Sequence, residues 1–127
     1  MSVQLQLTIT VNAPIAIAFH YLTDWPRQEE WMVGTYVEIT SEGDARYVGG
    51  KIAAFTGIGP LGFWDTMTIT QWDAPNYVEV DHTGKLVRGI GYMRFRTIND
   101  STCSFEWGEV LDLPLGWVGR MGFALLR

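Results

Sequence analysis

The sequence has 127 residues, of which 47% are apolar, and a formal net charge of −5. This length is typical of one domain that buries roughly two-thirds of its unfolded surface, so we expect residues 1–127 to form a single domain. The negative charge disfavours nucleic acids and stable association with anionic membranes, because both attract clusters of Lys and Arg.

The first quarter of the chain predicts one strand followed by two helices. Residues 3–11 alternate apolar and polar side chains, which is the period-two pattern of a half-buried strand. Apolar residues then recur at helical spacing from Ile15 onward, with Asn12 as a candidate cap and Pro14 in the first turn. Pro26 favours a second, short helix at 26–32, because its fixed φ suits the start of a helix.

The rest of the chain predicts strands and then one last helix. Alternating and β-branched residues, separated by turns rich in Gly, Asn, Asp and Pro, predict six further strands at 34–40, 51–56, 63–72, 77–83, 86–98 and 102–111. Pro114 begins a segment, 114–127, that we predict to be helical although its three glycines cost about 1 kcal/mol each. Antiparallel strands with helices on one side predict an α+β fold, a curved sheet packed on helices.

The stretch GIGPLG, residues 57–62, matches the G-x-G-x-x-G pattern of dinucleotide-binding loops. That pattern binds a pyrophosphate where it follows a strand and opens a helix. Here it joins two predicted antiparallel strands, and Pro60 lacks the backbone N–H that a phosphate would need. We therefore interpret the stretch as a strand-to-strand loop and not as a nucleotide site.

Three stretches of the chain carry a resemblance to a known family: TVNAPIAIAFHYLTDWPRQEEW (10–31), MTITQWDAPNYVEVDHTGKLVRGIG (67–91) and STCSFEWGEVLDLPLGWVGRMG (101–122). They resemble the SRPBCC superfamily, which has the START-like or Bet v 1-like helix-grip fold, and within it the actinobacterial polyketide cyclase/dehydrase-like proteins. The resemblance implies a seven-stranded curved antiparallel sheet wrapped around a C-terminal helix, with a cavity for an apolar or amphipathic small molecule. Because that helix is usually longer in the family, we expect it to be truncated here.

Period-two alternation places three titratable residues on otherwise apolar strand faces. Asp65 shares a face with Phe63, Met67 and Ile69, His82 with Val78 and Val80, and Glu109 with Phe105, Trp107 and Leu111, while Trp64 and Trp72 fall on the face opposite Asp65. If these faces line the concave side of the sheet, Asp65, His82 and Glu109 enter an apolar cavity and are candidates for acid–base catalysis. The alternative is a solvated rim, because the two carboxylates lie near strand ends and His82 closely precedes a turn. A single bulge would also reverse an assignment.

The same faces supply the candidate ligand-binding residues. We predict contacts with the ligand from Trp31, Phe63, Met67, Ile69, Val80, Gly91, Met93, Phe95, Phe105 and Trp107. For Trp31 the alternative is packing in the core. Glycine weakens a strand interior, so Gly89 and Gly91 either enlarge the cavity or make room for the C-terminal helix. The apolar loop at 58–63 either acts as a flap at the cavity entrance or packs on the nearest helix.

Several kinds of chemistry find no support in the sequence. Its two His and one Cys are not at metal-ligand spacing, so we expect no metal, and we expect no other cofactor. Neither a nucleophile elbow nor a P-loop is present. Residues 1–10 lack the basic and apolar regions of a signal peptide, and Cys103 has no partner for an internal disulfide, so we expect a cytoplasmic protein.

Binding of a small hydrophobic or aromatic molecule, lipid-like or polyketide-like, in an internal cavity is the leading hypothesis for the function. The first alternative is an enzyme of the polyketide cyclase/dehydrase type, which the resemblance implies and in which Asp65, His82 and Glu109 would transfer protons. The second alternative is a module that binds a protein partner through its acidic surface and its apolar loop.

Overall fold

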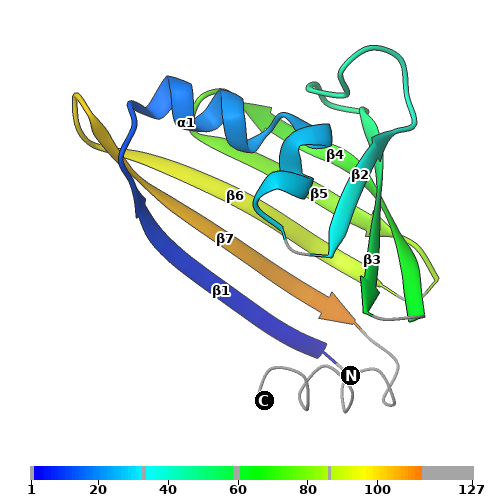
Figure 1. The fold of residues 1–127 in the computed structure, drawn as a ribbon. Coiled ribbons are helices and arrows are strands. Elements are labelled where there is room, and N and C mark those ends of the chain that lie inside the picture. The colour runs from blue at the N-terminus through cyan, green and yellow to red at the C-terminus, as the bar shows by residue number, and fades with distance from the viewer. Residues whose placement is uncertain (1, 33, 59–60, 86, 113–127) are drawn as a thin grey trace.

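Figure 1 shows the computed structural model, which describes residues 2–32, 34–58, 61–85 and 87–112. In chain order the elements are β1 (Ser2–Val11), α1 (Ile15–Leu22), the 3₁₀ helix η1 (Trp25–Glu30), β2 (Thr35–Ile39), β3 (Lys51–Ile58), β4 (Leu61–Asp73), β5 (Tyr77–Thr83), β6 (Arg88–Asn99) and β7 (Thr102–Asp112). The seven predicted strands are confirmed. The predicted C-terminal helix at 114–127, and with it the expected truncation, lies outside the described residues.

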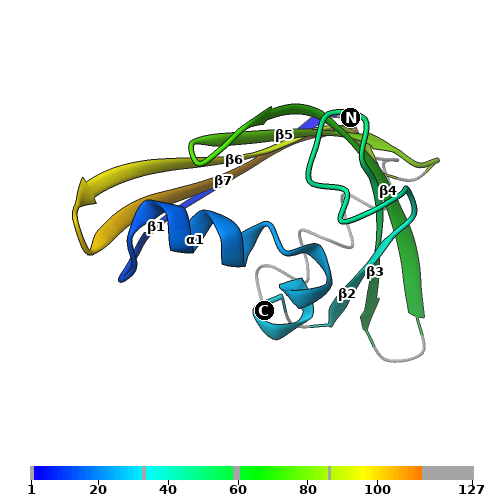
Figure 2. The same cartoon turned by 90° about the horizontal axis from the view of Figure 1, so that it is seen from above.

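The strands form one antiparallel sheet in the order β1-β7-β6-β5-β4-β3-β2. From β2 to β7 each strand pairs with the next one in the chain, and β1 pairs with β7. Figure 2 shows that the sheet bends between β5 and β2, and that α1 and η1 lie on its inner, concave side. The predicted curved seven-stranded antiparallel sheet, with two short helices after the first strand, is confirmed.

Both helices differ in detail from the prediction. Pro14 is the cap residue of α1, with an extended ψ of 148°, and no side chain makes a capping hydrogen bond, so Asn12 does not have its predicted role. The second helix starts at Trp25 and is a 3₁₀ helix of six residues with Pro26 in its first turn. Such short 3₁₀ segments are common as connectors, and this one leads the chain from α1 to β2.

An aromatic core lies where α1 covers one end of the concave face. The ring of Phe19 on α1 packs edge-on against Trp72 and Phe95, with ring centroids 5.2 and 5.1 Å away. Phe95 in turn contacts Phe105 on β7. Aromatic pairs of this kind contribute about 0.5–1.5 kcal/mol each beyond the area that they bury. This end of the sheet is therefore filled with side chains.

A β-bulge in β4 brings Trp72 into that core. Alternation predicted Trp72 on the same face as Trp64. The register between β4 and β5 shifts between Ile69 and Gln71, and an inserted residue reverses the face of the strand from there on. Trp64 is exposed, whereas Trp72 packs against the core. The prediction for Trp72 was therefore wrong, because alternation by itself does not reveal a bulge.

The GIGPLG stretch lies where β3 turns into β4. Gly57 pairs with Gly62, and Ile58 pairs with Leu61, in an antiparallel ladder. The stretch therefore joins two strands and opens no helix, which confirms the strand-to-strand interpretation. The side chains of Ile58 and Leu61 lie outside the described part of the structure, so the flap hypothesis stays a prediction.

Candidate functional site

A cavity of about 310 Å³ lies between η1 and the concave face of the sheet. Every strand contributes lining residues, and most of the lining side chains are apolar. Pockets that bind small molecules are typically about 300–1,000 Å³ and mostly apolar, with a few polar groups that orient the ligand. The size and the lining of this cavity are therefore those of a site for a small ligand.

Six of the predicted ligand-binding residues line the cavity. They are Phe63, Met67, Val80, Gly91, Met93 and Trp107. All six belong to β4, β5, β6 or β7 and lie on the faces that alternation assigned to the concave side. Their contact with a ligand stays a prediction.

The other four predicted residues lie away from the cavity lining. They are Trp31, Ile69, Phe95 and Phe105. The last three are almost fully buried in the core, and Trp31 packs edge-on against Phe105 at 6.4 Å between ring centroids. Trp31 therefore packs against the core, which was the alternative considered for it from the sequence. Alternation correctly gave the inward face of these strands, but it does not say which stretch of that face is covered by packed side chains.

Sequence reasoning missed several lining residues on η1 or just after it, on β2 and β3, and on β1. They include Leu5, Gln28, Met32, Thr35, Ile52, Ala54 and Thr56. For β3 the signal was present, because Ile52, Ala54 and Thr56 lie on one face of a predicted strand. For Gln28 on η1 and for Met32 just after it no signal was available, since a short 3₁₀ helix and the connection that follows it have no periodicity that tells which side packs inward.

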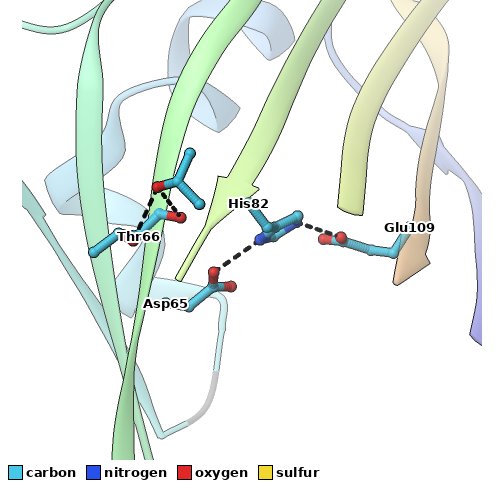
Figure 3. Close-up of polar contacts among 5 residues, drawn as sticks. Asp65, Thr66, His82 and Glu109 are labelled. Carbon is cyan, nitrogen blue, oxygen red and sulfur yellow. Dashed lines mark hydrogen bonds and ion pairs between the residues drawn. The ribbon is translucent and has the colours of Figure 1, made fainter. Parts of the chain in front are cut away.

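The three titratable candidates meet in this cavity (Figure 3). The ring of His82 lies between the two carboxylates, with Nδ1 2.8 Å from Asp65 Oδ1 and Nε2 2.6 Å from Glu109 Oε2. The His82 side chain is 3% exposed, and those of Asp65 and Glu109 are 16% and 13% exposed. The sequence left open whether these residues are buried in the cavity or solvated at its rim. His82 is buried, and both carboxylates are largely shielded from solvent.

Strand register explains how these residues come together. His82 on β5 pairs directly with Met67 on β4, so Asp65 is its diagonal neighbour on the same face. On the other side His82 pairs with Gly89 on β6, and Glu109 belongs to β7, one strand further away. The contact between His82 and Glu109 therefore passes over β6.

Gly91 on β6 leaves the space that this contact needs. Gly91 pairs with Glu109 on β7, and a Cβ at its position would lie 3.0 Å from both His82 Nε2 and Glu109 Oε2. Its neighbour Gly89 has a φ of +131°, and a Cβ there would lie 2.0 Å from the Val110 carbonyl oxygen, so only glycine fits. Gly91 lines the cavity, in agreement with the first of the two explanations considered from the sequence, whereas the second, room for the C-terminal helix, concerns residues outside the described ranges. In addition, the missing side chain of Gly91 allows His82 to reach Glu109.

The charges of the trio follow from its hydrogen bonds. Burial lowers the pKa of His82, but its hydrogen bonds to Asp65 and Glu109, together with their negative charges, outweigh that effect and raise the pKa to about 10. His82 is therefore an imidazolium at neutral pH, and each ring N–H donates to one carboxylate. Such charge-assisted hydrogen bonds are short and fix the ring in place.

Two further findings concern the described part of the chain. Within it no three His, Cys, Asp or Glu side chains are placed so that they hold a metal ion together. The longest helix found there, α1, has eight residues, and no helix in those ranges is long and apolar enough to cross a membrane.

Comparison with known proteins identifies the family. Residues 2–126 match the profile of the polyketide cyclase/dehydrase and lipid transport family. The chain belongs to this family. The resemblance to SRPBCC proteins of the polyketide cyclase type, proposed from three sequence stretches, is thereby confirmed. Among curated proteins no significant match was found.

Solved structures of similar shape agree with this family. The Zhui aromatase/cyclase from Streptomyces sp. R1128 is 18% identical with a TM-score of 0.73, and the alignment covers 90% of this chain and 70% of that one. A START superfamily protein from Mycobacterium smegmatis is 10% identical with a TM-score of 0.74, with coverage of 97% and 88%. The di-domain ARO/CYC BexL from the BE-7585A biosynthetic pathway is 13% identical with a TM-score of 0.70, and the alignment covers 98% of this chain but 42% of that one.

At these identities the likeness shows the fold, which is the START-like helix-grip fold. Together with membership of the family, it supports a ligand-binding or cyclase role for the chain.

Proposed function

We propose that the chain binds a small hydrophobic or aromatic molecule, lipid-like or polyketide-like, in the cavity on the concave face. The observation that carries this proposal is the apolar cavity of about 310 Å³ beside the aromatic core. Each 100 Å² of apolar ligand surface buried there contributes about 2.5 kcal/mol before the entropic cost of binding is subtracted. The Asp65–His82–Glu109 trio is the polar end of the cavity and orients the ligand.

Mass spectrometry of the full-length protein purified from its native host tests this proposal. We expect native spectra to contain a stoichiometric apolar compound and an organic extract of the same sample to yield that compound. The proposal fails if the protein is empty and takes up no compound from a panel of lipids and aromatic polyketides. Such a result would favour the alternative of a module that binds a protein partner.

A second candidate function is catalysis of the polyketide cyclase/dehydrase type. It is favoured by the hydrogen-bonded trio, because cyclisation with loss of water needs a base that takes a proton from carbon and an acid that protonates the leaving oxygen. In this role one carboxylate, of Asp65 or Glu109, accepts the proton from carbon. The other carboxyl group takes the proton of the His82 imidazolium and passes it to the leaving oxygen, which departs as water, and the first carboxyl group then returns its proton to His82. The apolar walls exclude water and hold the chain in the reactive conformation.

Single substitutions distinguish catalysis from binding alone. If the protein is a cyclase, His82→Ala or Asp65→Asn abolishes turnover while the affinity for a neutral aromatic ligand stays within about tenfold. If the protein is a carrier, the same substitutions change affinity only, and the wild-type protein forms no product at any pH. Product analysis by liquid chromatography and mass spectrometry, with ligand affinity measured in parallel, separates the two outcomes.

A further inference from the structure

The hydrogen bonds of the trio determine how many protons it holds. Both ring nitrogens of His82 lie within 2.8 Å of a carboxylate oxygen. Each of these two contacts needs one proton, because two lone pairs facing each other at that distance repel. Two protons among one imidazole and two carboxylates leave a net charge of −1. This charge is the same whether the second proton belongs to the ring or to one carboxyl group.

The only polar atoms of the trio that remain available to a ligand are hydrogen-bond acceptors. Both ring nitrogens of His82 are engaged, so the ligand meets the second oxygens, Asp65 Oδ2 and Glu109 Oε1. Neither of these oxygens makes a hydrogen bond to another described residue, and both side chains stay partly exposed. The free capacity at the polar end of the cavity is therefore that of carboxylate oxygens.

The rest of the described cavity lining does not offset this negative charge. It contains neither Lys nor Arg, and its other polar side chains, such as Gln28, Thr35 and Thr56, are neutral. A buried charge is tolerated where an opposite charge and hydrogen bonds compensate it. The Asp65–His82–Glu109 trio compensates a buried cation or hydrogen-bond donor, whereas a buried carboxylate would face an uncompensated second negative charge.

We infer that the molecule bound in the cavity has an apolar or aromatic body with a hydrogen-bond donor at its polar end, most favourably a protonated amine, and that the cavity excludes the corresponding carboxylate. This inference rests on the proposed function and names the ligand class that the same cavity selects. It separates amines and phenols, which the trio accepts, from free fatty acids and aromatic acids, which it rejects.

A series of naphthalene derivatives that differ in one group tests the inference. Binding of 2-naphthylmethylamine, 2-naphthol, 2-methylnaphthalene and 2-naphthoate is measured by calorimetry at pH 7 with the full-length protein. We expect the amine to bind at least tenfold more tightly than 2-methylnaphthalene. The naphthoate should bind at least tenfold more weakly than 2-methylnaphthalene, and the affinity of 2-naphthol should lie between those of the amine and 2-methylnaphthalene. Binding of the naphthoate as tight as that of the amine overturns the inference.

A charge-removing substitution adds a second test. Glu109→Gln keeps the size of the side chain and removes one negative charge, so we expect the preference for the amine over 2-methylnaphthalene to fall at least fivefold. The matched control is Glu38→Gln, which removes the same charge from the exposed face of β2 and leaves the preference unchanged. An unchanged preference in a folded Glu109→Gln protein contradicts the inference. If that variant does not fold, the four probes on the wild-type protein decide the question.

Different results overturn the two claims, that the cavity binds an apolar molecule and that it selects one with a hydrogen-bond donor. If none of the four probes binds, the inference fails, and uptake from the panel of lipids and aromatic polyketides decides whether the proposed function fails with it. If 2-methylnaphthalene and the naphthoate bind at least as tightly as the amine, cavity binding stands and the selection for a donor is wrong.

Discussion

The raised pKa of His82 predicts that the protein loses stability as the pH rises above neutral. The pKa is raised from 6.5 to about 10 in the folded state. Because His82 binds its proton more tightly in the folded than in the unfolded chain, protonation stabilises the folded state. This contribution is complete below pH 6.5 and is lost as the pH rises through 10. Between these values the unfolded chain releases the proton that the folded chain retains, so the free energy of unfolding falls by up to about 1.4 kcal/mol per pH unit.

The size of this effect is measurable within a narrow pH range. Integrated between pH 6.5 and pH 8.5, the linkage amounts to about 2 kcal/mol, since His82 in the unfolded chain is already half deprotonated at the lower limit. With a urea dependence of about 2 kcal/mol/M for a domain of this size, the midpoint of unfolding shifts by about 1 M. The range stops at pH 8.5 because the pKa of the Cys103 thiol is raised by burial, which adds a loss of the same sign at higher pH.

Urea unfolding followed by tryptophan fluorescence at pH 6.5, 7.5 and 8.5 measures this loss. The matched control is His20→Gln, which removes the exposed histidine on α1 and leaves the pH dependence unchanged. His82→Gln, which lacks the titrating ring, removes the dependence. Histidine NMR signals provide a test that needs no variant, because His82 should remain protonated across the whole range. A free energy of unfolding that stays level or rises from pH 6.5 to pH 8.5 in the wild-type protein refutes the reasoning.

Three substitutions test other parts of the structure. Gly91→Ala places a methyl group 3.0 Å from both atoms of the contact between His82 and Glu109, so the NMR titration of His82 moves to lower pH, whereas Gly84→Ala, with no atom closer than 3.5 Å, does not move it. Phe95→Ala empties the core beneath α1 and lowers the free energy of unfolding by about 3–5 kcal/mol in urea titrations; a loss below about 1 kcal/mol would contradict the placement of Phe95 in the core. Ala54→Phe fills part of the cavity and weakens binding of 2-methylnaphthalene at least tenfold by calorimetry, and unchanged affinity would show that the probe binds elsewhere.

Much of the fold could be predicted from local patterns in the sequence. Alternation of side chains placed all seven strands and put Asp65, His82 and Glu109 on inward faces, because a strand exposes one side to the core and the other to solvent. The GIGPLG stretch was correctly interpreted as a strand connection from its flanks. These features depend on residues close together in the chain, so the sequence by itself determined them.

The candidate site depended on contacts that local patterns do not encode. Alternation assigned Phe95 and Phe105 to the concave face, but their position beneath α1 follows from the way the helix packs. The bulge after Ile69 that turns Trp72 inward is likewise decided by the pairing of β4 with β5. The approach of His82 to Glu109, 27 residues apart in the chain, required the register of three strands and the missing side chain of Gly91. Only the tertiary structure decided this arrangement, because strand register and side-chain reach across a sheet are set by partners distant in the sequence.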